Sequence, residues 1–204
     1  MIPAAEALAL LRAGNQRFVA GELSHSVSLG QAQRTAVVEG QEPFAIVLGC
    51  SDSRVPAEMV FDQGLGDLFV IRVAGNIVAP SQVGSVEFAA AKFGTRLVVV
   101  LGHSRCGAVL ASLDELQSPT GSRSPNLSSI VDRIRPSLEP LLATELREDR
   151  EALVSAAVRA NVAAAVDHLR HGSEILEELI VGDGLAIVGA EYSLESGEVE
   201  FHEG

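Results

Sequence analysis

The chain has 204 residues, which is enough for one well-buried core, and it contains no internal repeat that would divide it into several domains. Hydrophobic residues make up 47% of it and charged residues 21%, a balance that excludes an intrinsically disordered protein. The formal net charge is -12 and the basic residues are scattered along the chain, which argues against a nucleic acid as partner. We therefore expect a single domain over residues 1–204 that binds no nucleic acid.

The N-terminal sequence MIPAAEALALLRAGNQRF lacks the basic segment and the long apolar segment of a secretory signal. No run of about 18 or more apolar residues is present, so the sequence predicts no membrane span. Two cysteines, Cys50 and Cys106, are too few for a disulfide framework and fit a reducing compartment. Together these features predict a cytoplasmic protein.

The first twenty residues carry an amphipathic pattern. Leu8, Leu11 and Phe18 fall near helical spacing, and Gly21 is a plausible stop, so the pattern predicts a helix. This helix precedes the first predicted strand and needs a surface to cover. We expect residues 1–35 to form a helical arm that packs on a partner subunit.

Four short apolar runs rich in β-branched residues predict strands at 44–49, 68–74, 96–102 and 185–192. Periodic patterns between them predict helices at 81–93, 106–116, 149–170 and 173–181. Strands that are hydrophobic throughout are typical of a sheet covered on both faces, so this order indicates an α/β fold with a mainly parallel central sheet flanked by helices. The final GEVEFHE alternates after a turn and predicts an antiparallel edge strand at the C-terminus. The Ser-, Pro- and Gly-rich stretch 117–129 predicts an exposed loop within the domain.

Reactive side chains follow two of the predicted strands. Cys50 ends the first strand, and His103 and Cys106 follow the third in VVVLGHSRCGAV. Ligands bind beyond the carboxyl ends of strands in parallel sheets, so we expect these residues to lie near one another. Two thiolates and an imidazole, with or without the carboxylate of Asp52, are a suitable zinc set. From these three residues alone, an equal alternative is two small buried cysteines and a histidine that caps a helix.

Asp52 and Arg54 favour the functional interpretation. They follow Cys50 at alternate positions in CSDSRVPAE, and charged groups beside a strand end need either pairing or a task. A guanidinium can hold a carboxylate through two parallel hydrogen bonds, so Arg54 is expected to orient Asp52. The three residues then form one polar site, with a thiol for the metal and an oriented carboxylate beside it.

The segments CSDSRVPAE, DLFVIRVAGN and VVVLGHSRCGAV resemble the β-class carbonic anhydrases in order and spacing, and the likeness extends from AGNQRFVAG to AIVGAEYSLESGEVEF. The resemblance implies Zn2+ on Cys50, His103 and Cys106, with the fourth position held by Asp52 or by the reactive water. It also implies reversible hydration of carbon dioxide to bicarbonate and a proton, by a zinc-bound hydroxide that the Asp52–Arg54 pair orients. A homodimer or a higher homo-oligomer is implied as well.

The resemblance assigns four further residues to substrate binding. Gln41, nine residues before Cys50, would donate its amide to a substrate oxygen, and Phe69 and Phe88 would line the carbon dioxide pocket. Phe88 stands where the family often has tyrosine. Gly107 would offer its backbone N–H to bicarbonate. Gln41 and Phe88 are expected to serve the zinc site of the neighbouring subunit. Without the resemblance, they would be interpreted as a loop residue, two core phenylalanines and a glycine that starts a helix.

One departure from the family concerns regulation. Some members carry a tryptophan in a second, inhibitory bicarbonate pocket, but that position is Val47 here and the chain has no tryptophan, so this regulation is not expected. The remaining histidines are expected at the surface, with a proton-shuttle role left open: His25, His168, His171 and His202. Two alternative functions are a related zinc hydrolase of carbonyl sulfide or carbon disulfide, and a zinc-stabilised module that is not an enzyme.

Overall fold

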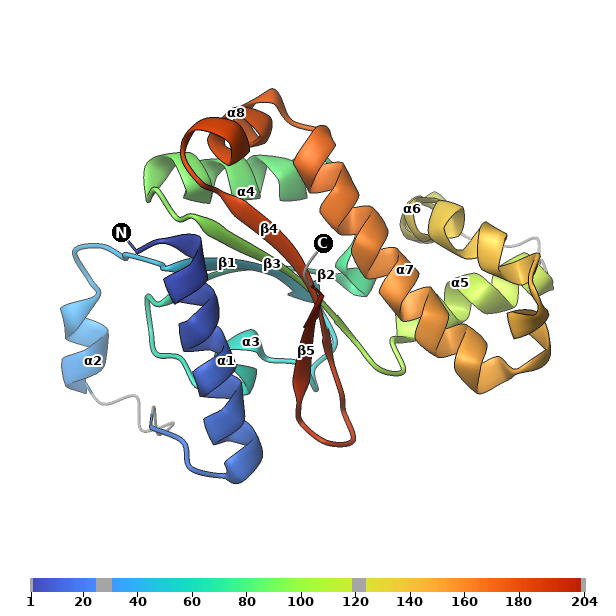
Figure 1. Ribbon diagram of the computed structural model, residues 1–204, viewed down its shortest axis with the longest axis horizontal. Coiled ribbons are helices and arrows are strands. Elements are labelled where there is room, and N and C mark those ends of the chain that lie inside the picture. Colours follow the sequence, from blue (N-terminus) through green and yellow to red (C-terminus); the bar gives the residue numbers. More distant parts are fainter. Residues whose placement is uncertain (1, 25–30, 119–123, 203–204) are drawn as a thin grey trace.

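A computed structural model describes residues 2–24, 31–118 and 124–202. Its central feature is a five-stranded sheet of order β2-β1-β3-β4-β5 (Figure 1). The strands are β1 (Ala45–Cys50), β2 (Leu68–Val73), β3 (Leu97–His103), β4 (Ala186–Tyr192) and β5 (Val199–His202). The first four strands are parallel, and β5 pairs antiparallel with β4 at one edge. The predicted mainly parallel α/β fold with an antiparallel C-terminal edge strand is confirmed.

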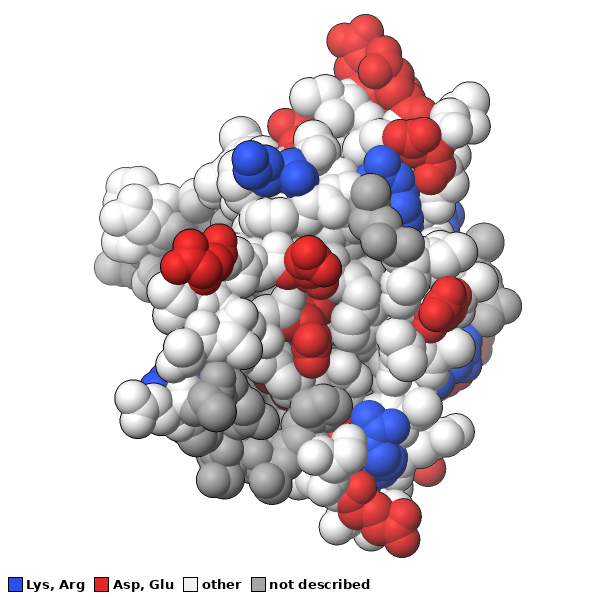
Figure 2. Space-filling model, turned by 90° about the vertical axis from the view of Figure 1, so that its left-hand side faces the viewer, with Lys and Arg blue, Asp and Glu red and all other residues white. Residues whose placement is uncertain are grey.

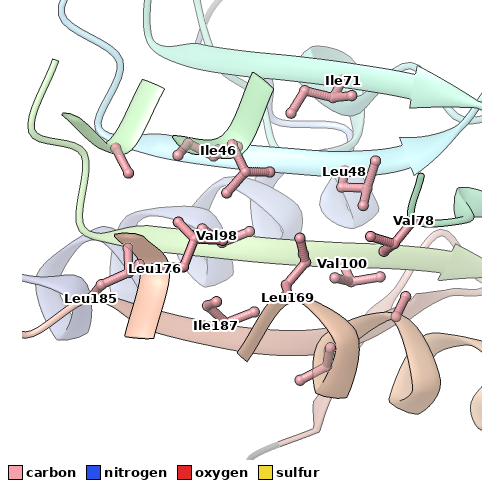
Figure 3. Packing of buried hydrophobic residues seen from close by; sticks show 14 of the residues in the cluster. Ile46, Leu48, Ile71, Val78, Val98, Val100, Leu169, Leu176, Leu185 and Ile187 are labelled. Atoms are coloured by element: carbon pink, nitrogen blue, oxygen red, sulfur yellow. The ribbon is translucent and has the colours of Figure 1, made fainter. Parts of the chain in front are cut away.

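Helices cover both faces of the sheet, because alternate residues of the central strands point to opposite sides. Ile46 and Leu48 of β1 pack with buried residues of α4 (Pro80–Lys92), α7 (Arg150–His171) and α8 (Glu174–Gly182) on one face (Figure 3). Val47, between them, packs on the other face with α1 (Ala4–Ala20) and α3 (Ala57–Val60). Every residue of β1 and β3 is buried, which explains their uninterrupted hydrophobicity.

The N-terminal helix is part of this subunit's own core. Leu11 of α1 is fully buried in the cluster that contains Val47, and Leu8 and Phe18 pack against the same cluster. Asn15 fixes the helix further: its amide nitrogen donates to the carbonyl groups of Val60 and Gly197. The apolar side of α1, which we expected to contact a partner subunit, therefore packs against the core of its own chain. Association of residues 1–35 with a partner remains a prediction that needs another surface; α2 (Gln31–Ala36) follows α1 in this segment.

One long helix was not predicted. The expected loop at 117–129 is wrong from residue 125 onward, because α6 (Pro125–Leu142) begins there, while residues 119–123 lie outside the described part. Ser124 caps α6 by accepting a hydrogen bond from the N–H of Leu127, and Pro125 occupies the first turn, where its missing N–H costs nothing. The serines and prolines that indicated a loop are thus the start signal of a helix.

α6 packs with α5 (Gly107–Gln117), the 3-10 turn Glu145–Glu148 and α7 beyond the carboxyl ends of the strands. Ile134 and Leu138 of α6 are fully buried in this third cluster, which also contains Cys50 and Cys106. The cluster therefore encloses the end of the sheet where the reactive residues were expected.

The surface agrees with the acidic composition. On the face shown in Figure 2, Lys and Arg side chains form separate small groups with uncharged or acidic surface between them. That face presents no continuous basic patch of the kind that binds nucleic acid. Within the described ranges, no helix combines the length and the apolar character needed to cross a bilayer.

Candidate metal centre

Cys50, His103 and Cys106 come together at the carboxyl end of the sheet. Cys50 is the last residue of β1, His103 is the last residue of the neighbouring β3, and Cys106 precedes the first residue of α5. Their ligand atoms all lie within 4.8 Å of one another, and the two sulfur atoms are 4.0 Å apart. All three side chains are buried. The sequence prediction that these residues converge is confirmed.

The two thiols cannot easily ionise together. The contact with the Cys106 thiol lowers the pKa of Cys50, with further contributions from His103 and from the N–H of Gly75. The ionised Cys50 sulfur and burial in turn raise the pKa of Cys106. Two thiolates at this separation need a cation between them, and a divalent metal ion supplies that charge.

His103 presents a free ring nitrogen to the same cluster. Its Nδ1 lies 2.9 Å from the carbonyl oxygen of Ser104, which can only accept, so Nδ1 carries a proton and Nε2 has the lone pair of the neutral imidazole. Nε2 is buried without a hydrogen-bond partner. A buried polar atom left unpaired is costly, and a metal ion would satisfy it. Two sulfur atoms and one nitrogen are a donor set that zinc favours.

Asp52 lies beside these ligand atoms and is held by Arg54. The Nε and Nη2 groups of Arg54 donate to Oδ1 and Oδ2 of Asp52 over 2.9 Å and 2.7 Å, and the backbone N–H of Arg54 also donates to Oδ1. These bonds to Arg54 hold the pKa of Asp52 well below its usual range. Oδ2 of Asp52 is 3.9 Å from Nε2 of His103. An ionised carboxylate therefore stands next to the proposed metal position.

Two residues that sequence reasoning missed, Arg72 and Gly75, hold Cys50 and the segment after it. Arg72 of β2 donates from Nε to the carbonyl oxygen of Cys50 and from Nη2 to that of Asp52, at 3.0 Å and 2.6 Å. The N–H of Gly75 donates to the Cys50 sulfur over 3.3 Å. Arg72 could have been noticed in the sequence, because it is a charged residue within the apolar run LFVIRVA.

The turn between His103 and Cys106 is held from the other side. Arg105 has a φ of 55°, a left-handed conformation that is unfavourable for a residue other than glycine. Glu195, in the turn between β4 and β5, accepts hydrogen bonds from the Ser104 hydroxyl and from Nε of Arg105, both at 2.8 Å. These contacts stabilise the strained turn. No pattern in the sequence predicted this role of Glu195.

The four residues assigned to substrate binding occupy different places. Gly107 is the exposed first residue of α5, directly after Cys106. Phe69 pairs with Ile46 rather than with the end of β1, so it lies about 13 Å along the sheet from the level of Cys50. Phe88 is 53% exposed and its ring packs 6.2 Å from that of Phe69.

Gln41 is exposed and precedes β1, at the opposite end of this strand from Cys50. This chain therefore does not bring Gln41, Phe69 or Phe88 to its own metal cluster. The service of Gln41 and Phe88 to a partner's site remains a prediction, as does the role of Phe69 in substrate binding. Of the other histidines, His168 and His171 are exposed, as expected, and His202 is half-buried. His25 lies outside the described residues.

Comparison with known proteins identifies the family. A family model described as carbonic anhydrase matches residues 45–199, the segment that contains the whole metal cluster. The chain belongs to the β-carbonic anhydrase family. It is 41% identical over 190 residues to carbonic anhydrase 2 of Mycobacterium tuberculosis, covering 92% of this chain and 87% of that protein. It is 40% identical to a carbonic anhydrase of Mycolicibacterium smegmatis, covering 93% and 89%.

Solved structures of β-carbonic anhydrases share the fold. The β-carbonic anhydrase CcaA superposes with a TM-score of 0.75 at 26% identity, over 98% of this chain and 89% of that one. One of two tetrameric β-carbonic anhydrases from Sordaria macrospora gives a TM-score of 0.71 at 24% identity, over 97% and 96%. The chain is therefore an enzyme of carbon dioxide hydration on a β-carbonic anhydrase fold.

Proposed function

We propose that this carbonic anhydrase binds one Zn2+ ion through Cys50, His103 and Cys106 and hydrates carbon dioxide reversibly with the help of Asp52 and Arg54. The observation that carries the proposal is the convergence of two sulfur atoms and an unpartnered, buried imidazole nitrogen within 4.8 Å. A zinc ion there would act as a Lewis acid that lowers the pKa of a water molecule to near neutrality.

Asp52 supplies the orientation that the reaction needs. Its carboxylate is ionised, and Oδ2 lies beside the ligand atoms, so it can accept a hydrogen bond from the attacking water and direct a lone pair toward carbon dioxide. Arg54 fixes both carboxylate oxygens in a planar fork, which keeps Asp52 from turning toward the ligand atoms. The products are bicarbonate and a proton, which matches the activity of the family.

The proposal includes a homodimer or a larger homo-oligomer in the cytoplasm. The exposed Phe88, packed on Phe69 at the edge strand β2, supports association at that edge, and Gln41 would then approach a partner's metal cluster. Both cysteines are free thiols within the proposed metal cluster and form no disulfide. Free thiols of this kind support a reducing compartment.

Metal analysis joined to a stopped-flow hydration assay tests the zinc site. Wild-type protein is expected to hold about one zinc per chain, and His103→Ala to lose both zinc and activity. His171→Ala is the matched control, because this histidine is exposed on α7 and should change neither quantity. Full hydration activity of a rigorously metal-free protein would refute the proposal.

Sedimentation tests the oligomer. Phe88→Glu places a charge on the proposed interface and is expected to shift the protein toward monomers and to reduce activity. Val181→Glu is the control, since Val181 is 89% exposed on α8. Unchanged association of Phe88→Glu would exclude this edge as the interface.

The sulfur substrates gain no support from the comparisons, because the relatives described above are named as carbonic anhydrases. A zinc module without activity also fits poorly, since a purely structural metal would not require an Asp–Arg pair beside its ligands. Parallel assays with carbon dioxide, carbonyl sulfide and carbon disulfide measure the preference directly.

A further inference from the structure

A two-step chain of hydrogen bonds links α7 to one of the cluster's sulfur atoms. Asn161 of α7 donates from its amide nitrogen to the carbonyl oxygen of Gly75 over 2.8 Å. The N–H of Gly75 in turn donates to the Cys50 sulfur over 3.3 Å. Asn161 is only 4% exposed, so its amide has been taken out of water for this contact.

Gly75 occupies a backbone position that only glycine fits. Its φ is 70°, in the left-handed region that glycine enters freely, and its neighbours leave no room for a side chain. A Cβ there would meet Cδ1 of Ile134 at 2.9 Å and the Cβ of Ala108 at 3.0 Å. The packing therefore requires glycine, and the Asn161 amide restricts the freedom that glycine brings.

We infer that Asn161 is a positioning residue that holds the Gly75 N–H on the Cys50 sulfur and thereby tunes how strongly this thiolate donates to the metal ion. A hydrogen bond to a thiolate withdraws electron density from sulfur, and such outer contacts adjust both metal affinity and metal acidity. The inference rests on the proposed zinc site. Asn161 would influence the metal without touching it or the substrate.

Cobalt spectroscopy of Asn161→Ala tests this inference. In protein loaded with Co2+, loss of the hydrogen bond should make the thiolate more electron-rich and move the sulfur-to-cobalt charge-transfer band to longer wavelength. Zinc affinity, measured by competition with a chelator, should change by about 10- to 100-fold, as is usual for contacts of this kind. Asn161→Ser removes less volume and is the second variant if the alanine variant does not fold.

Asn15→Ala is the matched control. Asn15 is also a buried asparagine, 6% exposed, whose amide donates to backbone carbonyl groups, but these belong to Val60 and Gly197. Its loss should lower stability and leave the cobalt band in place. A shift in both variants would mean that the band reports general loosening, which would overturn the inference.

The wild-type protein supplies an independent measurement. In protein loaded with 113Cd, a hydrogen bond from Gly75 to a coordinated sulfur should give a scalar coupling between the metal and the Gly75 amide proton. Absence of this coupling, or an unshifted cobalt band in folded Asn161→Ala, would overturn the inference. Failure of the wild-type protein to bind cobalt, cadmium or zinc would refute the zinc site itself, which separates the two outcomes.

Discussion

Replacing Gly102 by alanine should disturb the metal centre through the packing of α7. Gly102 directly precedes His103 in β3, and a Cβ at this position would lie 2.5 Å from Cγ2 of Val162 and 3.4 Å from Cγ1 of Val158. The first distance is about 1 Å short of a normal carbon–carbon contact. Val162 cannot yield easily, because it is 1% exposed and also faces Gly189.

Overpacking of this kind costs about 1–3 kcal/mol. For a chain of this length, each kcal/mol lowers Tm by about 2–4 °C, so we expect Gly102→Ala to lower Tm by about 2–12 °C. Gly49 offers a matched control, since it directly precedes Cys50 in β1 and its nearest foreign atom would be 3.8 Å from a Cβ. Gly49→Ala meets no such clash and should not destabilise the fold; by restricting the unfolded chain it should stabilise by about 0.4–1 kcal/mol.

Thermal unfolding of the zinc-loaded proteins and stopped-flow hydration measure both consequences. If β3 is displaced, His103 moves with it, and a misplacement of about 1 Å can reduce a rate by about 100-fold. Val162→Ala in the Gly102→Ala background removes the clashing methyl groups and should recover part of the activity. Equal Tm values and equal rates for Gly102→Ala and Gly49→Ala would refute the packing argument.

Three further predictions concern charge and metal. Arg54→Ala should retain zinc but lose most hydration activity, measured by stopped flow from about pH 6.5 to 9. Arg54→Lys should recover little activity, because an ammonium group lacks the planar fork of the guanidinium. Wild-type rates in Arg54→Ala would mean that the Asp52–Arg54 pair is only structural. Chelation of zinc should lower Tm, and added zinc should restore it in a concentration-dependent way; a Tm independent of zinc would contradict coupling of metal and fold. Glu195→Gln should slightly lower Tm at pH 7. The hydroxyl of Ser104 and the charge of Arg105 lower the pKa of Glu195, so its contribution is present above its unfolded pKa and lost as the pH falls through the folded value. The difference from wild type should therefore shrink as the pH falls through the folded pKa of Glu195, and a difference in Tm that does not shrink as the pH falls would contradict this assignment.

The sheet could be predicted from sequence because its strands are buried on both faces. β1 and β3 are uninterrupted apolar runs, and their ends differ from the predicted ones by one residue. α6 was missed because composition and periodicity disagreed: Ser124, Pro125, Pro136 and Pro140 indicate a loop, while the buried faces of the helix follow a helical period. The packing against α5 and α7 decided in favour of the helix.

The convergence of Cys50, His103 and Cys106 could be predicted because they lie in short, chemically distinctive segments at the ends of neighbouring strands. The residues that hold those segments could not. Arg72 contacts a carbonyl 22 positions away, Asn161 one 86 positions away, and Glu195 a hydroxyl 91 positions away. Contacts across such separations depend on which elements the fold brings together, and no local pattern in the sequence records them.

The charges at this end of the sheet explain why the metal and the fold should be coupled. The two sulfur atoms are 4.0 Å apart, and Oδ2 of the Asp52 carboxylate lies 3.9 Å from Nε2 of His103. The half-exposed Arg54 neutralises the Asp52 carboxylate, with which it pairs over 2.7 Å. Burial makes the repulsion between two thiolates energetically unfavourable. Without a cation one of the two thiols therefore keeps its proton, in line with the raised pKa of Cys106. A divalent ion bound there would favour release of that proton and would accept the lone pair of His103. The same interactions that would bind the metal would therefore also hold together the ends of β1 and β3 and the start of α5.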